Sequence, residues 1–290
     1  MKKSTKVMLV LAAVFTTVGI GFTVGGVAMG ATMDSVEILR NIKEHRSWFH
    51  FSDVLDNDWD WDWNWDDDDD GKAEADSVKS GDTRVYEIVP VQEMKIKLRY
   101  DELILQEYDG ETIKVEVKND SSKYVTVKSD EEELEITSSR KKNNRSVRVS
   151  YPKDSSFREL ELEVDAGTVT VAGTLQAENV SVIVGAGEFT GTGGIVAREC
   201  EVEVGAGEID LEGIDAENIS GECGVGSLTL GLMGSEKDYN YSLECGIGDI
   251  TIGGESYSGL GREKDIQNPG AARELDLECG MGEIDVSFER

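Results

Sequence analysis

The chain has 290 residues and a formal net charge of −30, because 59 acidic side chains outnumber 29 basic ones. A protein that binds nucleic acid neutralises phosphates with lysine and arginine, so this balance argues against a nucleic-acid partner. It argues equally against direct docking on anionic lipid. Cationic partners, neutral glycans and protein surfaces remain.

The first 33 residues predict a membrane anchor. Lys2, Lys3 and Lys6 form a basic head, and residues 7–33 contain no charged side chain. A run of that length can span a bilayer whose hydrocarbon core is about 30 Å thick. The positive-inside rule keeps the basic head in the cytoplasm and places the bulk of the chain outside the cell. We therefore expect a single-pass membrane protein, with a cleaved signal peptide as the alternative.

Residues 34–82 predict a juxtamembrane segment and an acidic linker. In an extended chain, Trp59, Trp61, Trp63 and Trp65 would share one face. That face would stack on sugars, cover the start of the β-domain that follows as a lid, or lie at the membrane surface. The acidic side chains offer the oxygen ligands that Ca²⁺ prefers, and the alternative is a solvated, self-repelling linker. We expect no other cofactor; the candidate Ca²⁺ ligands are Asp58, Asp60, Asp62, Asp66, Asp68 and Asp70.

Residues 83–156 alternate between apolar and polar side chains, as in 94–98 and 113–117, and turn-forming residues such as Asp109 and Gly110 separate the runs. This alternation predicts half-buried strands. We interpret the segment as irregular N-terminal coils that continue into the domain that follows. An independent β-sandwich is the alternative.

Residues 157–290 repeat one phrase, glycine-x-glycine-acidic-apolar-x-apolar. Among the first four copies, each begins 19 or 20 residues after the start of the one before it. A fixed period of this length, with period-2 alternation inside it, is typical of a stacked solenoid. The sequence therefore predicts an all-β fold, a parallel β-solenoid with coils of about 20 residues, preceded by one transmembrane helix. The copies begin at Asp165, Gly185, Gly205, Gly224, Gly246 and Gly280.

The glycines of the phrase predict sharp corners, because glycine accepts positive φ and crowds little against the next coil. An acidic column after the corners contains Glu188, Glu208, Asp249 and Glu283, and we interpret it as a solvated stripe. The last strand ends at Phe288 with no evident cap. That end would leave a pairing edge through which copies of the chain self-associate.

All four cysteines replace aliphatic residues of other copies. Cys223, Cys245 and Cys279 share one position of the repeat, and Cys200 occupies another. Free cysteine behaves as a small buried hydrophobe, so we expect all four in the core. A disulfide between Cys223 and Cys245, on coils that are neighbours in sequence, is the alternative.

An insertion interrupts the fifth copy at residues 253–271. Insertions in a solenoid form loops on one face, and such loops often carry binding. Tyr257 and Leu260 are the candidate contacts for a glycan or protein ligand, and a loop without function is the alternative.

The chain resembles a family of bacterial surface proteins, widespread in Gram-positive bacteria, that are described as putative adhesins. The resemblance rests on the membrane segment, the glycine phrases and the block from Tyr239 to Ile284, and it covers about residues 83–290. It implies a β-solenoid at the cell surface and carries no established chemistry. Some relatives resemble members of cell-envelope stress operons, which implies a membrane-protein partner.

Catalytic motifs are absent from the repeats of this sequence. Both histidines, His45 and His50, precede the repeats, and the glycine phrases match neither the phosphate loop nor the dinucleotide-binding fingerprint. We therefore predict that the chain is not an enzyme. The favoured function is a membrane-anchored extracytoplasmic adhesin or surface-binding module, and the alternative is an envelope-stress accessory that binds a membrane partner.

Overall fold

The computed structural model describes residues 75–80, 83–139, 145–257 and 262–289. The predicted membrane segment and the Trp/Asp-rich stretch lie outside these residues. Residues 69–290 form one compact unit by themselves. No helix within the described part of the chain is both long enough and apolar enough to cross a membrane.

The prediction of an all-β solenoid is confirmed. Apart from one short 3-10 helix, η1 (Glu236–Asp238), the regular elements described are strands. The strands alternate buried side chains with side chains that are partly or fully exposed, as in Glu93–Leu98, where Met94, Ile96 and Leu98 are buried and the residues between them are partly exposed. Alternate side chains of a strand point to opposite faces, so each coil turns its apolar half towards its own interior.

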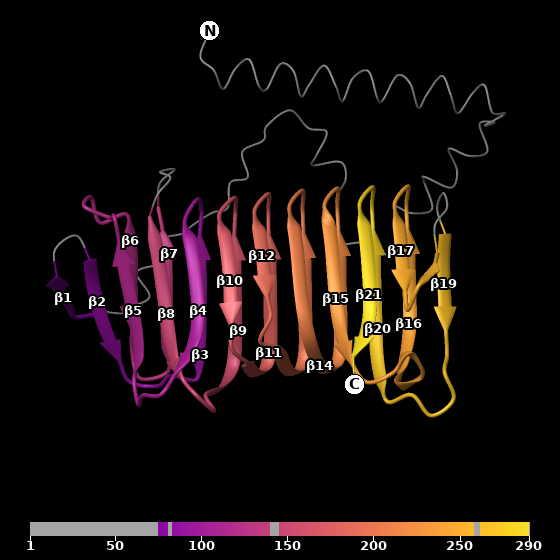
Figure 1. The fold of residues 1–290 in the computed structure, drawn as a ribbon, viewed down its shortest axis with the longest axis horizontal. Coiled ribbons are helices and arrows are strands. Elements are labelled where there is room, and N and C mark those ends of the chain that lie inside the picture. The colour runs from indigo at the N-terminus through magenta and orange to yellow at the C-terminus, as the bar shows by residue number, and fades with distance from the viewer. Residues whose placement is uncertain (1–74, 81–82, 140–144, 258–261, 290) are drawn as a thin grey trace, which may run out of the picture. The chain divides into compact units, whose positions relative to one another are not determined.

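Each coil contributes one strand to each of two faces (Figure 1). Face A contains, in spatial order, β6 (Val125–Ser129), β7 (Glu133–Ser138), β3 (Glu93–Leu98), β9 (Ser156–Val164), β11 (Leu175–Val184), β13 (Ile195–Val204), the second half of β14 (Glu208–Cys223), β20 (Arg273–Cys279), β16 (Tyr239–Cys245) and β19 (Arg262–Ile266).

Face B contains the strands that follow the glycine turns, together with an antiparallel group at each end. In spatial order these are β1 (Ser77–Ser80), β2 (Thr83–Ile88), β5 (Ile113–Lys118), β8 (Ser146–Pro152), β4 (Glu102–Tyr108), β10 (Thr168–Ala172), β12 (Glu188–Gly191), the first half of β14, β15 (Ser227–Met233), β21 (Glu283–Glu289), β17 (Asp249–Ile252) and β18 (Glu255–Ser256).

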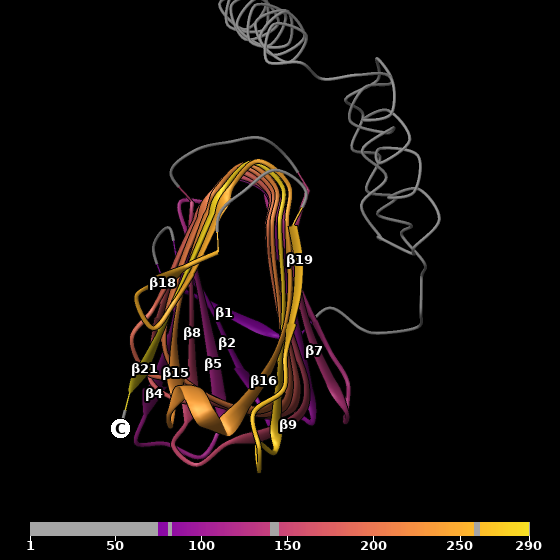
Figure 2. The same ribbon diagram turned by 90° about the vertical axis from the view of Figure 1, so that its right-hand side faces the viewer.

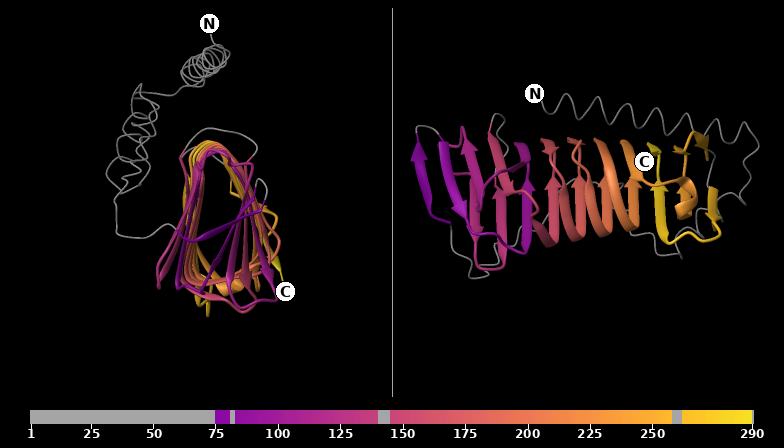
Figure 3. Two further views of the ribbon diagram at one scale, coloured as in Figure 1. Left: turned by 90° about the vertical axis from the view of Figure 1, so that its left-hand side faces the viewer. Right: turned by 60° about the horizontal axis from the view of Figure 1, so that its bottom comes forward.

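The two faces converge at the Gly-x-Gly turns and separate at the opposite side, which gives a wedge-shaped cross-section (Figure 2). Viewed along the stack, successive coils superimpose (Figure 3). Apolar side chains from both faces fill the wedge in one continuous core, which extends from Tyr86 to Val286. The described residues of the unit 69–290 share this one core, so that unit is expected to fold by itself.

The second glycine of each phrase is required for close stacking of the backbone. A Cβ on Gly187 would lie 2.3 Å from the carbonyl oxygen of Gly167, and one on Gly207 would lie 2.2 Å from that of Gly187. The expectation of positive φ at these corners is wrong. Positive φ instead occurs at the wide side of the wedge, for example at Gly173 and Gly213, where the chain passes from one coil to the next.

The coils at the C-terminal end are not stacked in sequence order. The last coil, β20 and β21, lies between the coil of β14 and β15 and the coil of β16 and β17. Figure 1 shows this as yellow strands enclosed by orange ones. The insertion at 253–271 provides the return path, and its strands β18 and β19 pair antiparallel at the end of the stack.

The predicted open edge at the C-terminal strand is therefore wrong, because β21 pairs with β15 on one side and with β17 on the other. The outermost strand of face A at this end is β19, and its sequence Arg-Glu-Lys-Asp-Ile is mostly charged. Charged side chains on an edge strand oppose edge-to-edge pairing. Copies of the chain are therefore not expected to self-associate through β21.

The cysteines fill the core, as predicted. All four are free and buried, with exposed fractions of 1–2%. The alternative of a bridge between Cys223 and Cys245 is wrong, because the inverted coil order places Cys279 in register between them. The sulfur of Cys223 lies beneath Gly282, whose added Cβ would be 2.4 Å from it, so glycine at the corner also makes room for the thiol.

The N-terminal end of the stack is held by a buried ion pair where the glycine phrase is missing. Arg145 Nε donates to Asp101 Oδ1, and both side chains are fully buried. Ser138 Oγ donates to the other carboxylate oxygen at 2.5 Å. Asp101 occupies the corner position that Gly167 takes in the adjacent coil, and Arg145 immediately precedes β8. The pair therefore links the coil of β7 and β8 to the coil of β3 and β4.

Candidate functional site

The middle residues of the Gly-x-Gly turns form a continuous exposed line along the narrow side of the wedge, which we call the ridge. Their backbone N–H groups donate to the preceding coil at 2.6–2.8 Å, so the line is a regular ladder rather than a set of loose loops. The ridge consists, in spatial order, of Ala166, Ala186, Ala206, Val225, Met281 and Ile247.

The ridge is apolar along its whole length. Val225 is 50% exposed, Met281 is 39% exposed and Ile247 is 52% exposed. These three come from distant parts of the sequence and become neighbours only because the last coil inserts between the coils of Val225 and Ile247. Turn tips are usually polar, so three adjacent exposed apolar side chains at such tips constitute a patch that needs a functional explanation.

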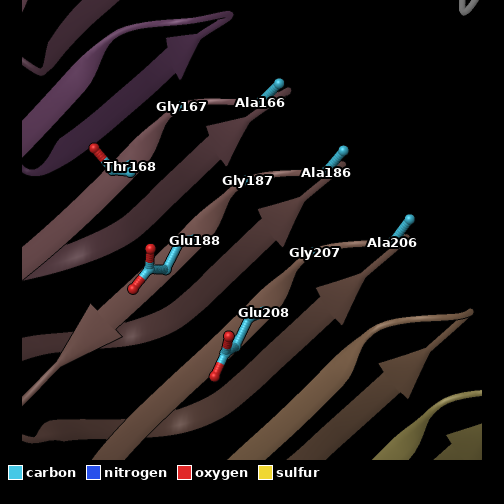
Figure 4. Close-up of a pocket in the computed structure, with 9 residues that line it drawn as sticks. All are labelled: Ala166, Gly167, Thr168, Ala186, Gly187, Glu188, Ala206, Gly207 and Glu208. Carbon is cyan, nitrogen blue, oxygen red and sulfur yellow. The ribbon is translucent and has the colours of Figure 1, made fainter. Parts of the chain in front are cut away.

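The alanine half of the ridge borders a shallow hollow. The hollow has a volume of about 430 Å³, and it is lined by three consecutive coils with Thr168, Glu188 and Glu208 on one wall. Figure 4 shows Ala166, Ala186 and Ala206 at the tips and the two carboxylates on the adjacent strands of face B. The ridge thus combines a low half lined by alanine with a raised half formed by larger side chains.

A row of carboxylates runs beside the ridge on face B. Glu188 pairs in register with Glu208, and Glu283 pairs with Asp249. Ser227 separates these two pairs, lying between Glu208 and Glu283. The acidic column seen in the sequence is therefore real, but its last two members are stacked in inverted order.

A second carboxylate row runs beside the ridge on face A. It consists of Glu203, Glu222, Glu278 and Glu244, one on each of four adjacent parallel strands, and we call it the glutamate row. Adjacent strands are about 4.8 Å apart. The ion pairs found among the described residues involve none of these four glutamates.

Burial and like-charge neighbours raise pKa values along the glutamate row. Half-burial raises the pKa of Glu278 to about 7, with further contributions from Glu222, Glu244 and Asp276. Half-burial also raises the pKa of Glu222, and the charge of Glu203 adds to that effect. Like charges directly opposite one another on paired strands are destabilising, so this row favours the protonated form of the folded protein.

The glutamate row predicts that acidification from about pH 8 to about pH 5 stabilises the fold. The folded-state pKa of Glu278 lies above its unfolded value of 4.5. The folded protein therefore holds more protons than the unfolded chain between these values, and the free energy of unfolding falls as the pH rises through about 7. The free energy of unfolding of residues 69–290 is measured in urea at several pH values. Glu278→Gln should reduce the slope of this free energy against pH by an amount that corresponds to at most about one bound proton per molecule. Glu188→Gln, on the exposed row of face B, is the control; equal slopes for wild type and Glu278→Gln would contradict the account.

The sequence-predicted binding residues are only partly described. The tryptophans 59–65, the candidate Ca²⁺ ligands 58–70 and Leu260 lie outside the described residues. Tyr257 follows β18, and its ring carries the Lys264 ammonium 4.2 Å from the centroid, while its hydroxyl donates to Glu255 at 3.1 Å. Its ring face towards Lys264 is therefore occupied.

Sequence reasoning missed the ridge, although a signal for it was present. The middle position of the phrase is apolar in every copy, at Ala166, Ala186, Ala206, Val225, Ile247 and Met281. A turn position that is repeatedly apolar is unusual for a solvated tip. What the sequence could not show is that Met281 lies next to Val225, because that contact depends on the inverted coil order.

Among the comparisons with known proteins, a family model covers most of the chain. The model of the Toastrack DUF4097 family matches residues 77–290. Among curated proteins, none is similar to this chain. A solved structure described as a putative cell adhesion protein from Clostridium sporogenes is 18% identical, with 71% of this chain and 99% of that chain covered and a TM-score of 0.41. A putative adhesin from Parabacteroides distasonis is 14% identical, with 73% and 97% covered and a TM-score of 0.36. One from Parabacteroides merdae is 15% identical, with 75% and 100% covered and a TM-score of 0.30.

Proposed function

We propose that this chain, which belongs to the Toastrack DUF4097 family through residues 77–290, is a surface-binding module without catalytic activity. In this proposal the N-terminal segment anchors it in the cell membrane, and the solenoid lies outside the cell and attaches to a glycan or protein surface. The family and the fold are the starting point, and the proposal about binding depends on the ridge.

The observation that carries the proposal is the continuous apolar ridge. The described part of the chain exposes six large hydrophobic side chains, and three of them, Val225, Met281 and Ile247, are adjacent on the ridge. Exposed apolar side chains that gather in one place, bordered by polar residues, mark interaction sites on soluble domains. The ladder of backbone hydrogen bonds beneath them presents these side chains on a rigid support, which reduces the entropy lost on binding.

Two of the four thiols, those of Cys200 and Cys245, are unsuited to nucleophilic catalysis. Burial raises the pKa of Cys200 to about 12 and the pKa of Cys245 to about 11. A thiol with such a pKa is almost entirely protonated at neutral pH, and the thiolate is the reactive form. These cysteines are therefore suited to packing.

The test is saturable binding of residues 69–290 to surfaces. Cell walls of the source organism and immobilised host matrix proteins are incubated with the labelled protein, with Ca²⁺ and with a chelator. Saturable binding that heat-unfolded protein does not reproduce is the expected result. Absence of saturable binding to every surface would overturn the proposal. Cross-linking of the full chain in cells to a membrane protein would then favour the envelope-stress accessory.

A further inference from the structure

We infer that the ridge binds a basic amphipathic helix, either a peptide or a segment of a partner protein. This assignment rests on the surface-binding function proposed above and gives the chemistry of its partner. It depends on three features of the ridge. These are its raised half, Val225, Met281 and Ile247, which we call the crest, the carboxylate rows on both sides of the ridge, and the spacing of the coils.

The apolar crest would contact the apolar side of the helix. Val225, Met281 and Ile247 stand on successive coils, each flanked along the chain by two glycines that contribute no side chain of their own. The outward-facing side chains nearest to the crest are therefore three glutamates on face A and one serine and two carboxylates on face B: Glu222, Glu278 and Glu244, and Ser227, Glu283 and Asp249. An apolar line one side chain wide matches the narrow stripe of a helix whose apolar residues are spaced alternately three and four residues apart.

The carboxylate rows would contact basic side chains at both borders of that stripe. Glu188, Glu208 and Glu283 are exposed on the face B side, and the glutamate row lies on the face A side. Basic side chains on either side of a helix's apolar stripe would complement both rows at once. The same charges disfavour the two other occupants of an apolar ridge, because a second copy would bring its own carboxylates and an anionic lipid surface would repel both rows.

The spacing of the coils fits a helix that lies along the ridge. Coils repeat about every 4.8 Å and helical turns about every 5.4 Å, so one turn lies over roughly one coil. The six coils from Ala166 to Ile247 span about 24 Å, which corresponds to a helix of about 16 residues. The step from alanine to larger side chains along the ridge would set the direction of the helix, with larger apolar groups over the hollow beside Ala166, Ala186 and Ala206.

The probe is a fluorescent peptide of leucine and lysine, about 16 residues long, with leucines at i, i+3, i+7 and i+10, which form a narrow stripe. Two control peptides accompany it: one has the same composition in scrambled order, and one has glutamate in place of lysine. Binding to residues 69–290 is followed by anisotropy at low and at physiological salt. The patterned lysine peptide should bind, and both controls should bind at least about tenfold more weakly.

The protein variants locate the binding. The triple variant Val225→Ser, Met281→Ser and Ile247→Ser removes the raised crest. The control variant Val78→Ser, Val89→Ser and Val196→Ser removes side chains elsewhere that are 39–74% exposed. All six positions are exposed, so both variants should keep the fold. The first variant should weaken peptide binding by at least about tenfold, and the second should leave it unchanged.

Equal affinities of the two triple variants, or equal binding of the patterned and scrambled peptides, would overturn the assignment. Preferential binding to phosphatidylglycerol vesicles would overturn it too, in favour of a lipid surface. If the patterned lysine peptide binds no better than its controls while saturable binding to cell walls persists, the surface-binding function stands and only the partner chemistry is wrong.

Discussion

Asp101→Ala is expected to lower the free energy of unfolding of residues 69–290 by about 3–5 kcal/mol. The substitution leaves the fully buried Arg145 guanidinium without its carboxylate partner, and an unpaired buried charge is among the largest single destabilising effects. Ser138 also loses the acceptor of its 2.5 Å hydrogen bond. Arg145→Ala should lower the free energy of unfolding by a similar amount, because it leaves the buried Asp101 carboxylate without its guanidinium partner.

The control is an exposed ion pair in the same part of the stack. Lys153 and Asp109 are 2.9 Å apart with side chains 57% and 87% exposed, and breaking an exposed pair typically costs less than about 1 kcal/mol. Urea unfolding of the single and double variants would complete the cycle. The Asp101/Arg145 double variant should be less destabilised than the sum of its single variants. Additive effects, or a cost for Asp101→Ala no larger than that for Lys153→Ala, would show that the buried pair does not hold the N-terminal coil.

Gly207→Ala is expected to destabilise the fold by about 3 kcal/mol, the upper end of ordinary overpacking. The added Cβ would lie 2.2 Å from the carbonyl oxygen of Gly187 and 3.1 Å from a methyl group of Val184. Because the closest atom belongs to the backbone of the adjacent coil, the coils have to separate at the corner. The lower chain entropy of alanine in the unfolded state offsets only about 0.4–1 kcal/mol of this cost.

Ala206→Val is the matched control for Gly207→Ala. It adds two methyl groups one residue away, at an exposed tip, where Val225 already occupies the equivalent position of the next coil. Its effect should stay within about 0.5 kcal/mol. If thermal and urea unfolding gave the two variants equal stabilities, the close backbone stacking at the second glycine would be contradicted.

The repeat phrase was sufficient to predict the fold class, because its alternation and period both depend on local chemistry. The position of the cysteines in the core followed from the same register. The order of the coils did not follow, because Cys223, Cys245 and Cys279 occupy the same position of the repeat, and the coils that carry them are interchangeable in a parallel stack. Nothing in the phrase states that the chain returns through 253–271 to place its last coil inside the stack.

The candidate site was predictable only in its parts. The apolar middle residues and the acidic column are visible in the sequence, whereas the raised crest depends on Met281 being placed between Val225 and Ile247. The buried pair of Asp101 and Arg145 gave no sequence signal, since 44 residues separate its members and acidic and basic side chains are common throughout residues 83–152. Both features arise from contacts between coils, which local patterns do not encode.

The most direct test of the ridge as the binding site is the oxidation rate of Met281, measured while the protein is attached to cell walls or to matrix protein. Met281 is 39% exposed on the crest, and Met233, at the end of β15 on the wide side of the wedge, is the internal reference. Mass spectrometry after a brief peroxide pulse reports both rates in one sample. We expect binding to cell walls or matrix protein to slow the oxidation of Met281 and to leave that of Met233 unchanged. Saturable binding with Met281 oxidised as fast as in free protein would contradict the account and place the binding surface elsewhere.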